Sequence, residues 1–313
     1  MKSFHLLLLS IFFPAVVSAD VLSELSPFLR NTNLNYDPTD FDPDVAVEGP
    51  VYAPFSPADS DLGFQQILGT YKGRPPVYVV FDTSLNYTDN APGLTQASDN
   101  ESWFSATRLA ISWRPLIAYG WFADVGLSAD VFRFEGNDAA DFENFEPYVG
   151  VVKSIPELDD LLYYLRYDYQ RITRGGLSDS SYSAQLIRTG FQKPIILTTT
   201  QQLTAGIETS FDITANKDDY EHNEYGVNLA YTYWFTDELN AAFSWNGSMW
   251  DFRDGGRRDW SQIVGIEFSW MPCQYARVFT NVYYTNHNSN VDSEVNDFQA
   301  WQTGLGFGIT YSF

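Results

Sequence analysis

The sequence is short of basic residues, of histidine and of cysteine. Its 313 residues include 18 Lys and Arg against 40 Asp and Glu, with 3 His and 1 Cys. A formal net charge of -22 leaves no surface suited to neutralising phosphates, so we expect no nucleic-acid partner. One cysteine allows neither an internal disulfide nor a cysteine-rich metal site. With no glycine-rich phosphate loop either, we expect no cofactor and no metal centre.

Long apolar runs are also missing beyond the N-terminus, where no stretch approaches the roughly 18 residues of a transmembrane helix. Residues 1–19 have the pattern of a secretory signal peptide. Lys2 supplies the positive start, residues 6–13 are apolar except for Ser10, and Val17-Ser18-Ala19 provides small residues before a cut. This apolar run is too short to span a bilayer, so we predict cleavage and export.

Residues 20–76 form a polar leader that holds eight of the 15 prolines, together with many Asp and Asn residues. Proline cannot donate to a strand ladder, so we predict a mostly irregular periplasmic segment here. Two interpretations stay open: a loose tail, or a segment that docks on or partly plugs the rest of the chain.

From residue 77 to residue 313 the sequence alternates apolar and polar residues in segments of about ten, a period typical of β-strands. The segments cover residues 79–87, 103–113, 121–131, 145–155, 161–169, 181–192, 203–213, 225–235, 241–249, 260–270, 276–284 and 301–313. The sixth is the least regular. We predict an all-β body of about 12 strands.

The connections alternate too: long polar stretches follow odd segments, and mostly tight links follow even ones. The link at residues 193–200 is longer than the other tight links. Aromatic residues, 17% of the chain, gather near segment ends. One group is Trp113, Trp121, Tyr233 and Trp270, and the other is Trp103, Trp250, Trp260 and Trp301. Two aromatic girdles and unequal loops are typical of a barrel that crosses an outer membrane.

The last segment, Gly304 to Phe313, resembles the closing strand of Gram-negative outer-membrane β-barrel proteins. Its terminal Phe313 resembles the signal read by the barrel-assembly machinery, which the resemblance implies as a partner beside outer-membrane lipid. The resemblance implies a transmembrane antiparallel β-barrel whose function lies in its lumen and loops. An even strand count would place the leader and the short turns in the periplasm.

If the apolar face meets lipid, the other face carries charged residues into the lumen. The acidic set is Asp82, Asp124, Asp130, Glu146, Asp168, Glu208, Asp212 and Glu267, and the basic set is Arg108, Arg166, Arg188 and Arg277. This excess of carboxylates favours a narrow, weakly cation-preferring passive pore. A structural envelope barrel filled by mutual ion pairs is the equal alternative. Hydrophobic-solute uptake is a third function, which no particular residue supports.

The long connections carry clustered acidic residues. These are Asp138, Asp141 and Glu143, then Asp218, Asp219, Glu221 and Glu224, then Asp292, Glu294 and Asp297. Carboxylates could bind divalent cations such as Ca²⁺, but the spacing matches no defined calcium loop. Solvated loop tips are the simpler interpretation.

His287 and Ser289 lie in an H-x-S-N string that resembles the catalytic motif of outer-membrane phospholipase A. The resemblance implies His287 as general base and Ser289 as nucleophile. The chain departs from that motif, since Val291 follows where the family has glycine, and residues 298–303 contain no asparagine to orient the imidazole. We therefore expect no enzyme, with a phospholipase-like hydrolase as the alternative.

Overall fold

In the computed structural model the described residues are 51–52, 66–67, 77–91, 101–118, 120–136, 140–158, 161–173, 180–217, 220–253, 256–273, 275–291 and 297–312. The predicted signal peptide, and the leader apart from two short strands, lie outside them. Those strands, β1 (Val51–Tyr52) and β2 (Gln66–Ile67), pair antiparallel. Among the residues described, no helix is long and apolar enough to cross a membrane.

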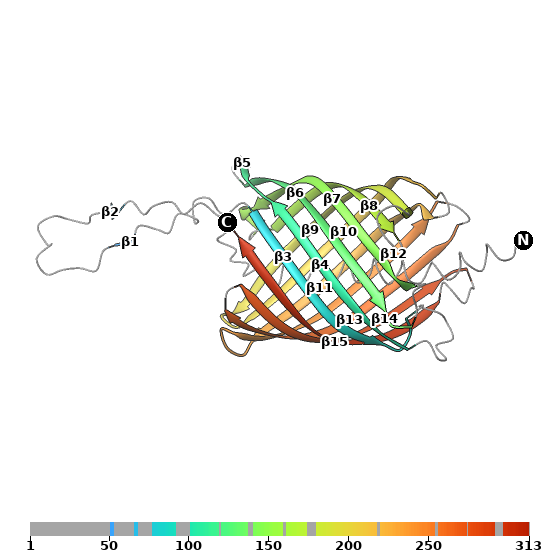
Figure 1. The fold of residues 1–313 in the computed structure, drawn as a ribbon. Helices are drawn as coiled ribbons and strands as arrows, with labels where there is room; N and C mark the ends of the chain where they lie inside the picture. The colour runs from blue at the N-terminus through green and yellow to red at the C-terminus, as the bar shows by residue number, and fades with distance from the viewer. Residues whose placement is uncertain are drawn as a thin grey trace, which may run out of the picture.

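The remaining strands form one antiparallel sheet that closes on itself (Figure 1). They are β3 (Val77–Thr88), β4 (Ser102–Trp113), β5 (Leu116–Ala118), β6 (Trp121–Phe134), β7 (Phe142–Ile155), β8 (Leu161–Thr173), β9 (Ser180–Thr198), β10 (Gln201–Ala215), β11 (His222–Trp234), β12 (Leu239–Phe252), β13 (Arg258–Cys273), β14 (Ala276–Ser289) and β15 (Phe298–Ser312). Twelve of these 13 strands complete the ring, because β4 pairs with β6 and the short β5 only extends the edge of β6.

Closure occurs between the first and last strands of the ring. β15 runs antiparallel to β3 from Gln302↔Thr88 to Ser312↔Tyr78, and Figure 1 shows the two side by side, both tilted to the barrel axis. A closed ring leaves no strand edge whose N–H and C=O groups lack partners. The predicted fold class, an all-β transmembrane antiparallel barrel of about 12 strands, is confirmed. Phe313 itself lies outside the described residues.

The sixth predicted strand was too short at its C-terminal end. β9 continues through Pro194 to Thr198, and only residues 199 and 200 connect it to β10. Proline normally argues against a strand because it cannot donate to the ladder. Here Pro194 nevertheless keeps its place in register opposite Thr204, so residues 193–198 belong to the wall and not to a loop.

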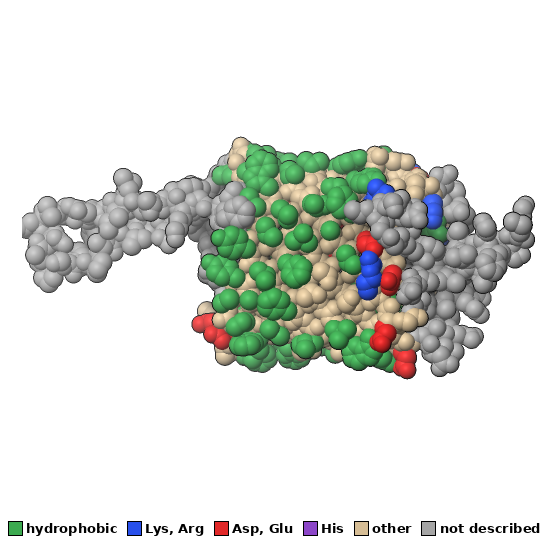
Figure 2. Space-filling view, in the orientation of Figure 1, with side chains coloured by type: hydrophobic (Ala, Val, Ile, Leu, Met, Phe, Trp, Pro, Cys, Tyr) green, Lys and Arg blue, Asp and Glu red, His purple; other side chains and the backbone are tan. Residues whose placement is uncertain are grey.

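The outer surface of the barrel is apolar over its middle. Figure 2 shows hydrophobic side chains spread across this face, with charged side chains toward its ends. Leu305, Leu229 and Phe243 all point outward and are exposed. Five of the predicted rim tryptophans are likewise exposed on this face: Trp103, Trp113, Trp260, Trp270 and Trp301. Trp121 and Tyr233 share the outward parity and are half-buried, and the Lys153 ammonium lies 4.9 Å from the Trp121 ring.

We predict that Leu305→Arg destabilises the barrel in lipid, because Leu305 is 62% exposed in the middle of β15. A cationic side chain at the bilayer midplane costs about 2–4 kcal/mol of unfolding free energy, falling to about 0–1 near the interfaces. Urea-induced unfolding of protein reconstituted in lipid vesicles measures the difference.

The matched control is Asn288→Arg, an outward position near the end of β14, which should change stability little. A barrel surrounded by water would tolerate both substitutions equally, and that result would contradict the membrane-facing assignment of this surface.

Candidate functional site: the inner wall of the barrel

The predicted lumen residues all lie on the inner parity of their strands. Asp124, Asp130, Glu146, Asp168, Asp212, Glu267, Arg108 and Arg188 are buried, whereas Asp82, Arg166, Glu208 and Arg277 are half-buried. The register between strands decides which of them meet. Arg108, for example, lies directly between Asp82 on β3 and Asp130 on β6. The inner wall is therefore a charged surface in which neighbouring strands supply opposite signs.

Two arginines on this wall each serve two carboxylates. Arg188 Nη1 lies 3.2 Å from Glu146 Oε1, and its Nε lies 3.8 Å from Asp168 Oδ2. Arg277 lies 3.1 Å from both Asp82 Oδ1 and Glu267 Oε1. Each of these arginines forms, with its two carboxylates, a group that carries a net negative charge. The charges are nevertheless paired with one another, as charges buried in a protein need to be.

Two further acidic residues are paired one to one with arginines. Arg108 Nε lies 3.2 Å from Asp130 Oδ1. Arg114 Nε lies 3.1 Å from Asp124 Oδ1, a partner that sequence reasoning did not foresee because residue 114 follows the end of β4. The wall thus combines the two predicted interpretations: most charges are mutually paired, and the carboxylates are still in excess.

Glu208 and Arg166 are the two predicted lumen residues that have no salt-bridge partner among the described residues. Glu208 accepts a hydrogen bond from the Tyr164 hydroxyl. The Arg166 guanidinium stacks on two rings, with its Cζ 4.8 Å from the Tyr148 centroid and 5.4 Å from the Tyr164 centroid. The Arg166 Nε is buried, and no residue in the described part of the chain hydrogen-bonds it.

Bulky inner side chains lie along the wall because the neighbouring strand places a glycine beneath them. Tyr283 is the register partner of Gly265, and a Cβ atom at residue 265 would overlap the tyrosine ring. Phe279 lies over Gly306 in the same way. The register directs these rings sideways onto the neighbouring strand.

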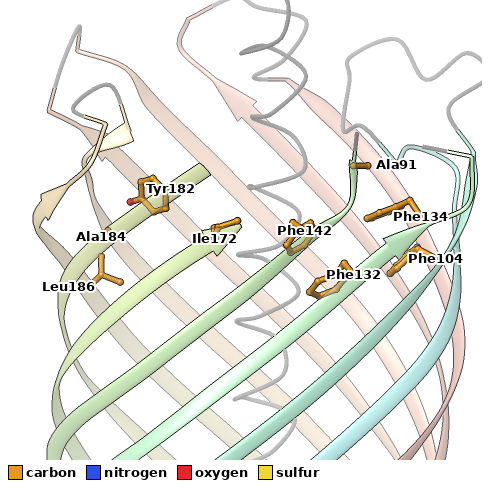
Figure 3. Close-up of a cluster of buried hydrophobic side chains, with 10 residues drawn as sticks. Ala91, Phe104, Phe132, Phe134, Phe142, Ile172, Tyr182, Ala184 and Leu186 are labelled. Carbon is orange, nitrogen blue, oxygen red and sulfur yellow. The ribbon is translucent and has the colours of Figure 1, made fainter. Parts of the chain in front are cut away.

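Part of the wall at the long-loop end is apolar, which sequence reasoning missed. Figure 3 shows this inner apolar cluster on the inside of β4, β6, β7, β8 and β9. Its members are Ala91, Phe104, Phe132, Phe134, Ala140, Phe142, Ile172, Tyr182, Ala184 and Leu186. Phe104 stacks on Phe134 at 4.9 Å, and Phe132 stacks on Phe142 at 4.4 Å. The sequence did contain a signal for this cluster. Near the ends of these strands the alternation is lost, and apolar residues also occupy positions that face inward.

A second apolar cluster lies on β12 and β15, and it corrects the predicted position of one girdle residue. Trp250 is 2% exposed and points inward, where it packs with Phe252 and Phe298. Both imidazoles of the predicted body, His222 and His287, lie 5.2 Å from the Trp250 ring. Trp250 therefore contributes to the inner wall and not to the lipid interface.

The two residues of the phospholipase-like motif are on the inner parity of β14, and no hydrogen bond joins them. His287 Nε2 lies 3.2 Å from Asp259 Oδ2, and the imidazole is 1% exposed and stacked on Phe298 at 5.2 Å. Asp259 is held in turn by Arg257, whose Nε lies 2.9 Å from Asp259 Oδ1. The Ser289 hydroxyl accepts from the backbone N–H of Val291 at 3.2 Å. Asp259 also accepts a side-chain hydrogen bond from Ser289, so the imidazole and the serine both bind this carboxylate and not each other.

The described residues of the predicted acidic loops serve as local hydrogen-bond acceptors, and two of them, Glu143 and Glu224, lie in β7 and β11 and not in a connection. Asp141 accepts from the backbone N–H of Phe134 at 2.7 Å, and Asp297 accepts from that of Ser289 at 2.6 Å. Glu143 and Glu221 pair with Arg133 and Arg253, and Glu224 accepts from Trp250 Nε1 at 2.8 Å. Asp138, Asp218, Asp219, Asp292 and Glu294 lie outside the described residues. Within the described part of the chain, no three His, Cys, Asp or Glu side chains are placed to hold a metal ion.

No known family model matches this sequence, and no curated protein matches it. Solved structures do match its fold. An outer membrane channel from Pseudomonas putida F1 superposes with a TM-score of 0.53 at 10% identity, covering 79% of this chain and 100% of that one. This likeness shows the fold alone.

Two other structures are less similar. The KdgM porin in complex with disordered oligogalacturonate has a TM-score of 0.41 at 13% identity, over 75% of this chain and 99% of that one. Outer membrane phospholipase A from Escherichia coli has a TM-score of 0.44 at 13% identity, over 74% of this chain and 92% of that one.

We predict that Gly265→Val destabilises the barrel by about 1–3 kcal/mol, the range for overpacking, because the Tyr283 ring occupies the space that the new side chain needs. Chemical denaturation in detergent measures it. Adding Tyr283→Ala to the same chain should recover part of the loss, since it removes the clash.

Gly226→Val is the matched control, because the atoms nearest to a Cβ at this inward glycine are 3.9 Å away. Equal destabilisation by the two glycine substitutions would contradict the interpretation that the ring depends on the glycine beneath it.

Proposed function

We propose that this protein is a passive pore of the bacterial outer membrane with a weak preference for cations. The observation that carries the proposal is a closed wall whose outer face is apolar and whose inner face is charged. A wall of this kind separates lipid from a polar interior. The fold shared with an outer membrane channel is consistent with the same role.

The orientation of the large inner side chains supports an open lumen that conducts ions over a lumen filled by side chains. Tyr283 and Phe279 lie flat on glycines, so two of the largest inner residues extend along the wall. A barrel of 12 strands is intermediate between small filled barrels and wide porins. We therefore propose a narrow channel for small solutes, with the predicted leader on its periplasmic side.

The excess of carboxylates supports the cation preference. Arg188 and Arg277 are each shared between two acidic residues, and Glu208 is held by a tyrosine hydroxyl. A lumen with net negative charge raises the local concentration of cations.

Uptake of hydrophobic solutes is a second candidate, favoured by the inner apolar cluster at the long-loop end. An apolar surface inside a channel attracts apolar solutes because it removes them from water. The two candidates differ in what should pass: inorganic ions in the first, and uncharged apolar molecules, detectable by a liposome-uptake assay, in the second.

We predict that the full chain forms discrete conductance steps in a planar bilayer and that Glu208→Gln lowers its cation-to-anion permeability ratio. A unit charge in water acts on an ion 4 Å away with about 1 kcal/mol, so the ratio should fall by at most about fivefold. Reversal potentials in a salt gradient give the ratio.

Asp251→Asn removes the same charge from an exposed outward pair with Arg258 and should leave the reversal potential unchanged. Silence across the voltage range would refute the pore. Equal shifts from Glu208→Gln and Asp251→Asn would show that the lumen carboxylates do not set the preference.

We predict no phospholipid hydrolysis by the purified protein with Ca²⁺, because the His287 Nε2 is bound to Asp259 and not to Ser289. Release of fatty acid from mixed micelles measures it. Hydrolysis that disappears in Ser289→Ala would establish the enzymatic alternative instead.

A further inference from the structure

We infer that Arg166 binds the carboxylate of small organic acids with an apolar body, as a local anion site on the otherwise acidic wall of the pore proposed above. This inference rests on that proposed function only for transport, since binding to the inner wall can be measured without conduction. Three features carry it: the uncommitted guanidinium, the way the side chain is held, and the apolar surface that leads to it.

The charge of Arg166 is not committed to a protein carboxylate. Among the predicted lumen arginines, Arg108, Arg188 and Arg277 all have a carboxylate oxygen within 3.2 Å. Arg166 has none within 4 Å in the described residues, and the carboxylates of Asp168 and Asp124 act on it only from farther away. Its Nε donates to no residue of the described ranges. A guanidinium in this state can still offer the paired N–H groups that match a carboxylate.

The side chain is held in place by its neighbours, so little entropy is lost when an anion binds. Its stem lies over Gly150, the register partner on β7, and its guanidinium stacks on Tyr148 and Tyr164. A face stacked on aromatic rings leaves the in-plane N–H groups free to donate.

Arg188, the register partner on β9, adds a second positive charge beside Arg166. Like charges directly across a strand pair repel one another. Glu146 and Asp168 offset the charge of Arg188 but are not paired with Arg166. Two guanidinium groups therefore lie side by side at this point, and a carboxylate bound to Arg166 would gain their attraction against the repulsion of Glu146 and Asp168.

An apolar surface runs toward this point from the long-loop end. On β9, Tyr182, Ala184 and Leu186 face inward directly before Arg188, and Leu186 is the register partner of Asp168 on β8. Ile172 and Phe142 belong to the same inner apolar cluster on β8 and β7, and Figure 3 shows these side chains on one side of the barrel. A solute entering along β9 would meet apolar side chains first and then the Arg188 guanidinium, with the carboxylates of Glu146 and Asp168 beside it, before it reaches Arg166. This order favours an apolar body with an anionic group over a sugar.

Benzoate is the probe, because it joins a carboxylate to an aromatic ring. We expect isothermal titration of the detergent-solubilised full chain to give a dissociation constant on the order of millimolar, weak enough for a permeant solute to leave. Acetate, which lacks the ring, and benzyl alcohol, which lacks the charge, should each bind at least several-fold more weakly.

Arg166→Gln should weaken benzoate binding roughly tenfold, the effect of losing one charge-assisted hydrogen-bonded pair. Arg166→Lys keeps the charge without the planar fork and should give an intermediate affinity. The matched control is Arg277→Gln, which removes a lumen arginine far along the chain and should leave benzoate binding within about twofold, with folding checked by heat-modifiable gel migration.

Benzoate binding that is lost in Arg166→Gln and kept in Arg277→Gln supports the inference, even if bilayers stay silent and the pore proposal fails. Conductance without benzoate binding, or equal losses in the two glutamine variants, overturns the inference while leaving the pore intact. Equal binding of acetate and benzoate overturns the assignment of an apolar body.

Discussion

The backbone ladder between β15 and β3 determines what the other strands can be. Inside a bilayer every N–H and C=O group needs a partner within the protein, and a sheet meets this requirement only when its first and last strands pair. Closure by Gln302↔Thr88 through Ser312↔Tyr78 links two segments more than 200 residues apart. Once the ring is closed, each strand has one face toward the outside and one toward the interior, and side-chain chemistry divides accordingly.

The interior shows how a charged wall can be stable without being neutral. Arg188 and Arg277 each join carboxylates from different strands, so the ion pairs also hold the strands in their register. Glu208 and Arg166 are held by tyrosines instead, and their charges remain available to whatever occupies the lumen. The structure therefore separates charges that stabilise the wall from charges that can act on a solute.

The strands and the sidedness of the wall could be predicted because alternation is a local pattern that each strand repeats. The inner contacts could not, because they depend on register between strands. Nothing near Arg188 in the sequence indicates Glu146, which lies 42 residues away, and Gly265 indicates Tyr283 only once β13 and β14 are aligned. Trp250 was misplaced because it was assigned by its position near a strand end, although the parity of Ala241, Phe243 and Trp245 puts residue 250 on the inward face. The last residues of β9 were predicted as a loop because Pro194 argues against a strand. They form a strand because they pair in register with β10.

The glycines beneath the inner rings have a consequence for how this protein can change over generations. A large residue at one position is tolerated only while its register partner has no side chain, so the two positions are coupled although neither touches a solute. A change at Gly265 becomes acceptable after Tyr283 has become smaller, and the reverse order is blocked. Among descendants of this protein, the width of the barrel would then change by paired substitutions on neighbouring strands. Such positions would co-vary between related sequences, whereas single substitutions at them would be rare.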